Sequence, residues 1–298
     1  MKILVLNCGS SSIKYKLFEM ESRQVLAQGG LEKINLPGSF LKITLPNGEK
    51  KILEREIKEH TAGVQFIFET LTHPEYGAVK SLDEINAVGH RVLHGGTKFS
   101  GSVLINDDVI RAVEECCDLG PLHNPANLAG IRGAIAQHPD VPNVAVFDTA
   151  FHQTMAPLAY NYAIDAEVAR ANRIRRYGFH GTSHAFVART ATAYLGLDPA
   201  TAKLITLHLG NGASACAIRG GKSIDTSMGM TPLEGLVMGT RSGDLDPAIL
   251  VHLVREAGMS IDEVDVLLNK DSGLKGLCGD GAGRIGPAAV MVTNRIFE

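Results

Sequence analysis

Two glycine-rich turns follow short apolar strands in this sequence, and each could hold an anion. The first reads NCGSSSIK over residues 7–14, and the second reads HLGNGAS over residues 208–214. A Gly turn lets backbone N–H groups approach an anion, Ser hydroxyls add donors, and Lys14 adds a positive charge. Gly and Ser also dominate ordinary hairpin turns. Two such turns, one from each domain and facing a shared cleft, would grip a polyphosphate from both sides.

Two arginines stand in segments that suit binding of an oxyanion. Arg91 lies in GHRVLHGG and Arg241 in GTRSGDLDP. A guanidinium binds a carboxylate or a phosphoryl oxygen through forked hydrogen bonds. Arg91 could instead form a surface ion pair. Arg241 stands in a Gly-rich loop where a cation can point into a cleft, and we expect Asp244 and Asp246 to orient it.

A carboxylate and a histidine complete the set of candidate groups. Asp148 ends the apolar strand in NVAVFDTAFH, a place suited to metal-water coordination or to base chemistry, although it could equally cap the following turn. His180 and His184 in YGFHGTSH have the i, i+4 spacing of a zinc pair. The glycines that flank His180 predict a loop there, which favours an anion-binding His180 and a structural His184. We expect Thr182 or Ser183 to cap a helix over residues 185–195.

The elements that must position these groups include a long-range repeat. The segment at residues 203–225 overlays the opening segment after a shift of about 201 residues, with Leu6 on Leu207 and Gly9 on Gly210. Each copy has a buried strand, a Gly-rich turn and two further strands. The matching order of three strands favours a duplicated domain over a chance match.

Helical segments follow the strands of the first copy. Helices are expected from Asp107 to about Cys117, and from Asn124, with Pro at its first turn, to about Gln137. The order predicts an α/β fold with helices on a mixed sheet, whose ligands bind at the carboxyl ends of strands. In the second copy, helices are expected at residues 247–256 and 261–268.

Domain boundaries follow from the repeat. We expect a first domain at residues 1–150, a second domain at residues 151–278, and a divergent tail at residues 279–298. The second copy begins near Lys203 and has far fewer residues than the first copy needs, so the second domain is expected to be incomplete.

Composition excludes several classes of function. The 298-residue chain has a net charge of −3, which gives no electrostatic case for nucleic acid or an anionic membrane. No apolar run has the length of a membrane span, and the N-terminus does not read as a secretory signal. The five cysteines are odd in number and form no Cys-x-x-Cys pair, which indicates reduced thiols and a cytoplasmic location.

Six motifs, in order over about residues 1–277, together resemble the acetate kinase (acetokinase) family: NCGSSSIK, GHRVLHGG, FDTAFH, YGFHGTSH, HLGNGAS and MTPLEGLVMGTRSGDLDP. That family belongs to the superfamily of sugar kinases, the Hsp70 ATPase domain and actin, with duplicated ribonuclease H-like domains. The resemblance implies phosphoryl transfer between ATP and acetate, giving acetyl phosphate and ADP. It also implies Mg²⁺, with Mn²⁺ as an alternative, and a homodimer.

The resemblance assigns roles to residues of this chain by class. Asn7 would help to hold the metal. The implied phosphate contacts are Lys14, His208, Leu209, Gly210, Asn211 and Gly212. The implied substrate-binding residues are Arg91, Leu122 and Pro232, with Val92 or Leu93 beside them. The implied catalytic residues are Asp148, His180 and Arg241. Because a carboxylate is already a competent nucleophile, Asp148 is better read as a positioner of metal or water than as an obligatory base.

The resemblance stops after about residue 279. Where the family has an Asp-Met/Phe-Arg element, this chain reads Gly283, Arg284 and Ile285, and the later adenosine loop, Glu metal ligand and terminal helix do not occur. This pattern indicates a truncated or frameshifted chain, with weak or no turnover and poor solubility. The alternatives are a propionate or short-chain acyl kinase, and a catalytically dead remnant that binds carboxylate or oligomerises.

Overall fold

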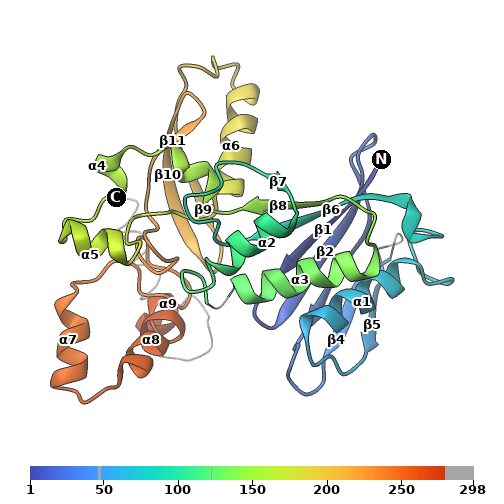
Figure 1. The fold of residues 1–298 in the computed structure, drawn as a ribbon, viewed down its shortest axis with the longest axis horizontal. Helices are drawn as coiled ribbons and strands as arrows, with labels where there is room; N and C mark the ends of the chain where they lie inside the picture. Colours follow the sequence, from blue (N-terminus) through green and yellow to red (C-terminus); the bar gives the residue numbers. More distant parts are fainter. Residues whose placement is uncertain (46–47, 122, 279–298) are drawn as a thin grey trace. The chain divides into compact units, whose positions relative to one another are not determined.

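The chain folds as two units in the computed structural model (Figure 1). Three stretches of the chain are described by the structure, residues 1–45, 48–121 and 123–278. The first unit is Met1–Ala150, and the second begins at Phe151. Two predictions from the sequence, on residue 122 and on the tail beyond residue 278, therefore concern residues outside the described stretches.

A mixed sheet of eight strands forms the first unit, in the order β5-β4-β3-β2-β1-β6-β8-β7. Strands β1 to β5 pair antiparallel in chain order, whereas β1, β6 and β8 run parallel to one another. The mixed sheet that the sequence predicted is thereby confirmed. The strands are β1 (Lys2–Cys8), β2 (Ser12–Glu19), β3 (Gln24–Glu32), β4 (Phe40–Thr44), β5 (Lys50–Glu54), β6 (Ile85–Val92), β7 (Val103–Leu104) and β8 (Asn143–Phe147).

Helices α1 (His60–Leu71) and α3 (Asn124–Gln137) pack on one face of this sheet, with α2 (Asp107–Glu114) beside α3 (Figure 1). The helix starts predicted at residues 107 and 124 are confirmed. Alternation along each strand sends one set of side chains into the core and the other set to the opposite face. The buried core includes Leu4, Leu6, Ile13, Leu17, Leu31, Leu41, Val64, Ile67, Phe68 and Val88.

Gly130 of α3 lies where this helix packs closely on β1. A Cβ atom at this position would lie 2.3 Å from the Sγ atom of buried Cys8. We expect Gly130→Ala to lower the free energy of unfolding by about 1–2 kcal/mol, because overpacking outweighs the helix propensity that alanine adds. Urea denaturation measures the change. Gly101→Ala is the control, because a Cβ there meets no atom within 4 Å; equal effects of the two substitutions would contradict the close approach.

His90 is a buried histidine on β6, and it makes the stability of the first unit depend on pH. Its Nε2 atom lies 2.7 Å from Oδ1 of Asn143, and burial lowers its pKa from 6.5 to about 4, partly offset by that hydrogen bond. The unfolded chain therefore binds more protons between these two values. Stability that is present above about pH 6.5 is lost as the pH falls toward 4, by about 3 kcal/mol for this group.

The pH dependence is measured by denaturation of the native chain and of His90→Gln, which keeps a donor for Asn143 without titrating. We expect the slope of stability against pH between about pH 4 and 6.5 to be smaller in His90→Gln. The exposed His252 supplies the control, His252→Gln. An unchanged slope in His90→Gln would show that this imidazole does not resist protonation.

An antiparallel sheet in the order β11-β10-β9 occupies the described part of the second unit, with α6 (Gly181–Tyr194) on one face. Ala188 of α6 packs with Cys216 and Ile218 of the sheet. No helix in the described stretches is both long and apolar enough to cross a membrane. The other elements are α4 (Pro157–Tyr160), α5 (Ala166–Ala171), β9 (Lys203–Leu209), β10 (Ala213–Arg219), β11 (Lys222–Thr226), α7 (Ala248–Arg255), α8 (Ile261–Lys270) and α9 (Gly273–Cys278).

The predicted repeat matches the strands of the two units, with one difference in the turn. β9 and β10 start 201 residues after β1 and β2. Cys8 faces Ile13 across the first turn, whereas Leu209 faces Ala213 across the second, so the second turn is one residue shorter. The two turns therefore present different numbers of backbone N–H groups despite their similar sequences.

The outer face of β9 leaves large apolar side chains exposed. Ile205, Leu207 and Leu209 are 77%, 45% and 64% exposed. Thr206, between the first two, is buried against α6, in keeping with the strand alternation. An apolar strip of this kind on a sheet face marks a surface that favours further contact.

Candidate active site

Asn7, Arg91 and Asp148 form one hydrogen-bonded cluster in the first unit. β1 and β6 run parallel side by side, which brings Asn7 next to Arg91, and Asp148 follows the neighbouring strand β8. Arg91 grips Asp148 with two bonds, Nε to Oδ1 at 3.0 Å and Nη2 to Oδ2 at 2.6 Å. Its Nη1 donates to Oδ1 of Asn7 at 3.2 Å. Three residues that the sequence predicted for the site are thus brought together.

The charge of this cluster is arranged with the anion inside and the cation toward the surface. The side chain of Asp148 is 3% exposed and that of Arg91 is 39% exposed. The nearby Asp148 carboxylate raises the pKa of Arg91, so the guanidinium stays charged. Of its five N–H groups, three make the bonds described above and two remain for a ligand. Asp148 therefore orients Arg91, a role that the sequence did not predict for it.

Other groups fix the turn that follows Asn7. The Gly9 N–H donates to the Ser12 carbonyl at 2.8 Å, and the Gly9 carbonyl lies 2.6 Å from Nε2 of His60 on α1. Asn127 of α3 donates to the Cys8 carbonyl at 2.7 Å. The sequence analysis missed His60 and Asn127, because only the packing of the two helices brings them to the turn.

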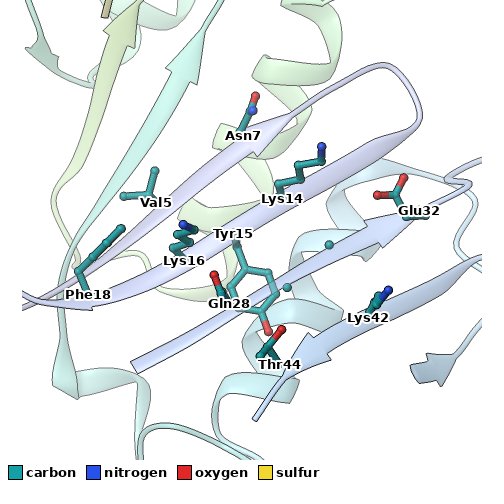
Figure 2. A pocket seen from close by; sticks show the side chains of 12 residues that line it. Val5, Asn7, Lys14, Tyr15, Lys16, Phe18, Gln28, Glu32, Lys42 and Thr44 are labelled. Atoms are coloured by element: carbon teal, nitrogen blue, oxygen red, sulfur yellow. The ribbon is translucent and has the colours of Figure 1, made fainter. Parts of the chain in front are cut away.

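Lys14 is exposed on β2 directly opposite Asn7 in the strand register. Figure 2 shows the two side chains at one end of a groove on the sheet face opposite α1 and α3. The groove has a volume of about 540 Å³, and Lys16 and Lys42 also line it. Its amines make this face of the first unit attractive to anions.

Oxygen atoms of the kind that bind Mg²⁺ lie together in the first unit. In the described stretches, no group of three or more His, Cys, Asp or Glu side chains gathers in a metal-binding arrangement. Mg²⁺ commonly takes one or two protein oxygens and completes its shell with water and substrate phosphates. The Asp148 carboxylate and the Asn7 amide oxygen, which converge on one guanidinium, offer that kind of partial set.

His180 stands at the N-terminus of α6 in a left-handed backbone conformation, with φ of 56°. The predicted cap at Thr182 or Ser183 is wrong, because the helix begins at Gly181 and both residues lie inside it. Such a conformation is uncommon outside glycine and costs of order 1–3 kcal/mol, so packing must hold it. Nδ1 of His180 and Nε2 of His184 both bond to Ser214 Oγ.

Arg241 and His180 approach the same point above Gly212. A Cβ atom on Gly212 would lie 3.3 Å from Arg241 Nη1 and 3.5 Å from His180 Nε2. Burial lowers the pKa of Arg241, and the structure gives it no carboxylate partner within the described ranges. Its Nη1 donates to the Pro232 carbonyl at 3.2 Å. Arg241, partly desolvated and next to the His180 imidazole and the Gly212 turn, is placed to bind a phosphoryl group.

The expected orientation of Arg241 by Asp244 and Asp246 is wrong. Asp244 accepts the backbone N–H of Gly235 at 2.7 Å, and Asp246 accepts that of Ala248 at 2.9 Å. Both aspartates therefore serve the backbone of the loop and the start of α7. Local hydrogen bonds of this kind compete successfully with an ion pair for a short acidic side chain.

Gly212→Ala tests whether this point is a binding site. The new methyl group would stand in ordinary to tight contact with Arg241 and His180, so the free energy of unfolding should change by less than about 1 kcal/mol. It would fill the space that an anion needs, and ATP should bind at least about tenfold more weakly. Isothermal titration calorimetry with ATP measures the loss. Gly101→Ala is the surface control, because a Cβ there meets no atom within 4 Å.

The remaining predicted residues are placed as follows. Leu122 lies outside the described residues. Val92 and Leu93 are buried in the first unit. Pro232 lies in the second unit, beside Arg241. His208 ends β9, Leu209 is exposed, and Gly210 closes the turn by donating to the Gly212 carbonyl at 3.0 Å.

An ion-pair cluster that the sequence did not indicate holds the loop carrying Pro232 and Arg241. Arg176 donates to Glu234 at 2.6 Å and to the Thr226 and Ser227 carbonyls at 3.0 and 3.1 Å. Tyr162 bonds to the other oxygen of Glu234, and burial, reinforced by that carboxylate, raises the pKa of Tyr162. Each of these bonds joins residues at least 50 positions apart in the sequence, so motif spacing could not predict the cluster.

The sequence was compared with protein families and with known proteins. The family model of the acetokinase family matches residues 2–283. The chain belongs to the acetokinase family. It is 62% identical to an acetate kinase of Phocaeicola vulgatus over 279 residues, which cover 94% of this chain and 70% of that protein. It is 60% identical to an acetate kinase of Bacteroides thetaiotaomicron, again over 94% of this chain and 70% of the relative.

Solved structures of the family agree with the fold. The crystal structure of Porphyromonas gingivalis acetate kinase, 55% identical, superposes with a TM-score of 0.90 over 93% of this chain and 70% of that one. A propionate kinase from Francisella tularensis, 45% identical, gives a TM-score of 0.87 with the same coverage. The resemblance, the α/β fold and the assignment to a family of kinases are therefore confirmed.

Proposed function

We propose that the chain transfers a phosphoryl group between ATP and acetate, giving ADP and acetyl phosphate. Membership of the acetokinase family supports the reaction class. The acetate assignment rests on Arg91, whose bonds to Asp148 and Asn7 leave two N–H groups for a ligand. A planar fork of this kind matches a small carboxylate.

In the proposed reaction an acetate oxygen attacks the γ-phosphorus of ATP. The new O–P bond forms as the bond from that phosphorus to the β–γ bridging oxygen breaks, and the electron pair leaves with ADP. No proton has to move, because acetate is ionised at neutral pH. The main task of the protein is to bring two anions together and to hold them in line.

The residues of each unit divide this task. Arg91 binds the acetate carboxylate, and Asp148 holds Arg91 in place. His180 and Arg241 donate to the transferring phosphoryl oxygens, while Lys14 and the turn from His208 to Gly212 contact phosphates. Mg²⁺, held by Asn7 and Asp148 together with substrate oxygens, would neutralise phosphate charge; Mn²⁺ is the alternative ion.

Acyl phosphate formation tests the proposal directly. Purified chain of verified mass is incubated with ATP, Mg²⁺ and acetate, and the product is trapped with hydroxylamine. We expect a hydroxamate that requires both ATP and acetate and that disappears in Arg91→Ala. A chain that is folded by circular dichroism but forms no acyl phosphate would overturn the proposal and favour the dead remnant that binds carboxylate.

A propionate or other short-chain acyl kinase is the second candidate, supported by the likeness to the Francisella propionate kinase. The same assay with propionate in place of acetate separates the two. We propose acetate because the two most similar of the relatives named above are acetate kinases. A higher kcat/KM for propionate than for acetate would reverse that choice.

Weak turnover, an unstable second unit and a homodimer also remain predictions. The exposed apolar strip of Ile205, Leu207 and Leu209 on β9 supports low stability or self-association of the second unit. Light scattering measures the oligomeric state, and urea denaturation followed by two probes measures whether the units unfold separately. A single transition in a monodisperse monomer would contradict the expected instability of the second unit and the expected homodimer.

A further inference from the structure

A chain of three hydrogen bonds runs from His180 into the core of the second unit. The Nδ1 atom of His180 lies 2.9 Å from Ser214 Oγ, which in turn lies 2.8 Å from Nε2 of His184. The Nδ1 atom of His184 lies 2.8 Å from Thr206 Oγ1. Ser214, His184 and Thr206 are all buried. Buried polar groups must satisfy one another, so the proton positions along this chain are coupled.

Thr206 determines which atoms donate and which accept along this series of hydrogen bonds. Within the described residues, the His184 ring is the one hydrogen-bond partner of its side chain. A buried hydroxyl hydrogen without an acceptor is costly, so the Thr206 O–H donates to Nδ1 of His184. The other nitrogen of His184 then carries the proton, and it donates to Ser214 Oγ.

Ser214 passes this direction on to His180. A hydroxyl has one hydrogen, and its oxygen already accepts from His184. The Ser214 O–H therefore donates to Nδ1 of His180, its second partner at 2.9 Å. A neutral imidazole carries one N–H, and Nδ1 of His180 acts here as an acceptor, so the proton resides on Nε2.

We propose that Thr206, His184 and Ser214 are positioning residues that keep the His180 proton on Nε2, where it serves as a hydrogen-bond donor to the transferring phosphoryl group. The inference rests on the proposed function for its role in catalysis, but not for the tautomer itself. Nε2 lies beside the point above Gly212 that Arg241 Nη1 also approaches. A lone pair at Nε2 would repel a phosphoryl oxygen there, whereas an N–H attracts it.

The ring of His180 is held in orientation as well as in protonation. It stacks on the His208 ring with centroids 3.9 Å apart and planes at 25°. His208 is fixed in turn by Ser183 of α6, at 2.9 Å from its Nδ1. The stacking disfavours a state in which both rings are positively charged, since like charges would then face each other. A neutral His180 avoids this repulsion and can still donate a hydrogen bond from Nε2.

Histidine side-chain NMR with nitrogen-15 labelling reports the tautomers of His180 and His184 and requires no catalytic turnover. Spectra are recorded at about pH 8, above the ordinary imidazole pKa of about 6.5. The signal of His180 is the one absent in His180→Gln. We expect an Nε2–H tautomer for His180 in the native protein. An Nδ1–H tautomer there would overturn the proposal.

Three substitutions separate positioning from stability. Thr206→Val keeps the shape but removes the hydroxyl that sets the direction, so His180 should become a mixture of tautomers. Thr206→Ser restores the hydroxyl and should restore the native spectrum. Thr226→Val is the matched control, because Thr226 is equally buried in the same sheet but its hydroxyl donates to the Ala215 carbonyl at 3.0 Å. Equal tautomer changes in both valine variants, or none in Thr206→Val, would overturn the proposal.

The hydroxylamine assay adds the catalytic consequence. We expect kcat to fall about 2- to 10-fold in Thr206→Val, the range for one misoriented hydrogen bond, with the KM for acetate unchanged. Thr206→Ser should recover most of kcat, and Thr226→Val should leave it unchanged. A native chain with no turnover would refute the proposed function, while the NMR result would still decide the tautomer. An unchanged kcat with a changed tautomer would refute the catalytic role of these residues.

Discussion

Arg91→Ala is expected to abolish most acyl phosphate formation and to destabilise the first unit at the same time. The substitution removes the fork that we assign to acetate, and a loss of about 10²–10³-fold in kcat/KM is the scale for such a charged contact. It also leaves Asp148, 3% exposed, as a buried carboxylate without its cation. Breaking a buried pair costs about 3–5 kcal/mol, and the 39% exposure of Arg91 reduces our expectation to about 2–3 kcal/mol.

Arg132→Ala provides the matched control for this prediction. Arg132 pairs with Glu114 on the surface of the same unit, and both side chains are well exposed. We expect a change within about 1 kcal/mol there, because exposed ion pairs contribute little. Urea denaturation and the hydroxylamine assay are run on both variants. If Arg91→Ala were as stable as Arg132→Ala, Asp148 would not depend on Arg91 for its burial.

Arg241→Met is expected to lower turnover by about 10²–10³-fold while leaving the stability of the second unit unchanged or slightly higher. A donor aimed at a developing oxyanion has an effect of this size. The stability expectation has the opposite sign to that of Arg91, because Arg241 is partly desolvated without a carboxylate partner among the described residues. Methionine fills the same space without requiring hydration, and the hydrogen bonds lost are those to the Pro232 carbonyl and to Sδ of Met238.

Arg176→Met is the comparison for Arg241→Met, because Arg176 is a cation of the same unit with a structural role. Arg176 is bound to Glu234 and to backbone carbonyls, so its loss removes the donor from several part-buried acceptors. We expect a clear loss in the free energy of unfolding for Arg176→Met and none for Arg241→Met. Denaturation of both variants followed by hydroxylamine trapping tests this contrast. A large stability loss in Arg241→Met would mean that Arg241 is a structural cation rather than a poised one.

The local sequence by itself determined the strands, the main helices and the first set of candidate groups. Burial alternates along β1 and β2, and Pro125 marks the start of α3, because these features depend on near neighbours in the chain. The shift of 201 residues located β9 and β10 for the same reason. Motif order alone identified the family to which the chain belongs.

Tertiary structure decided which partner each of these groups takes. Asp148 pairs with Arg91, 57 residues away, and Ser214 joins His180 to His184, because packing of strands and helices brings distant positions within hydrogen-bond reach. The same packing placed His180 at a left-handed helix start, where the sequence had predicted a later Ser or Thr cap. Side-chain types set which chemistry is available; desolvation and geometry, which exist only in the folded chain, set the charge and proton position that each side chain adopts.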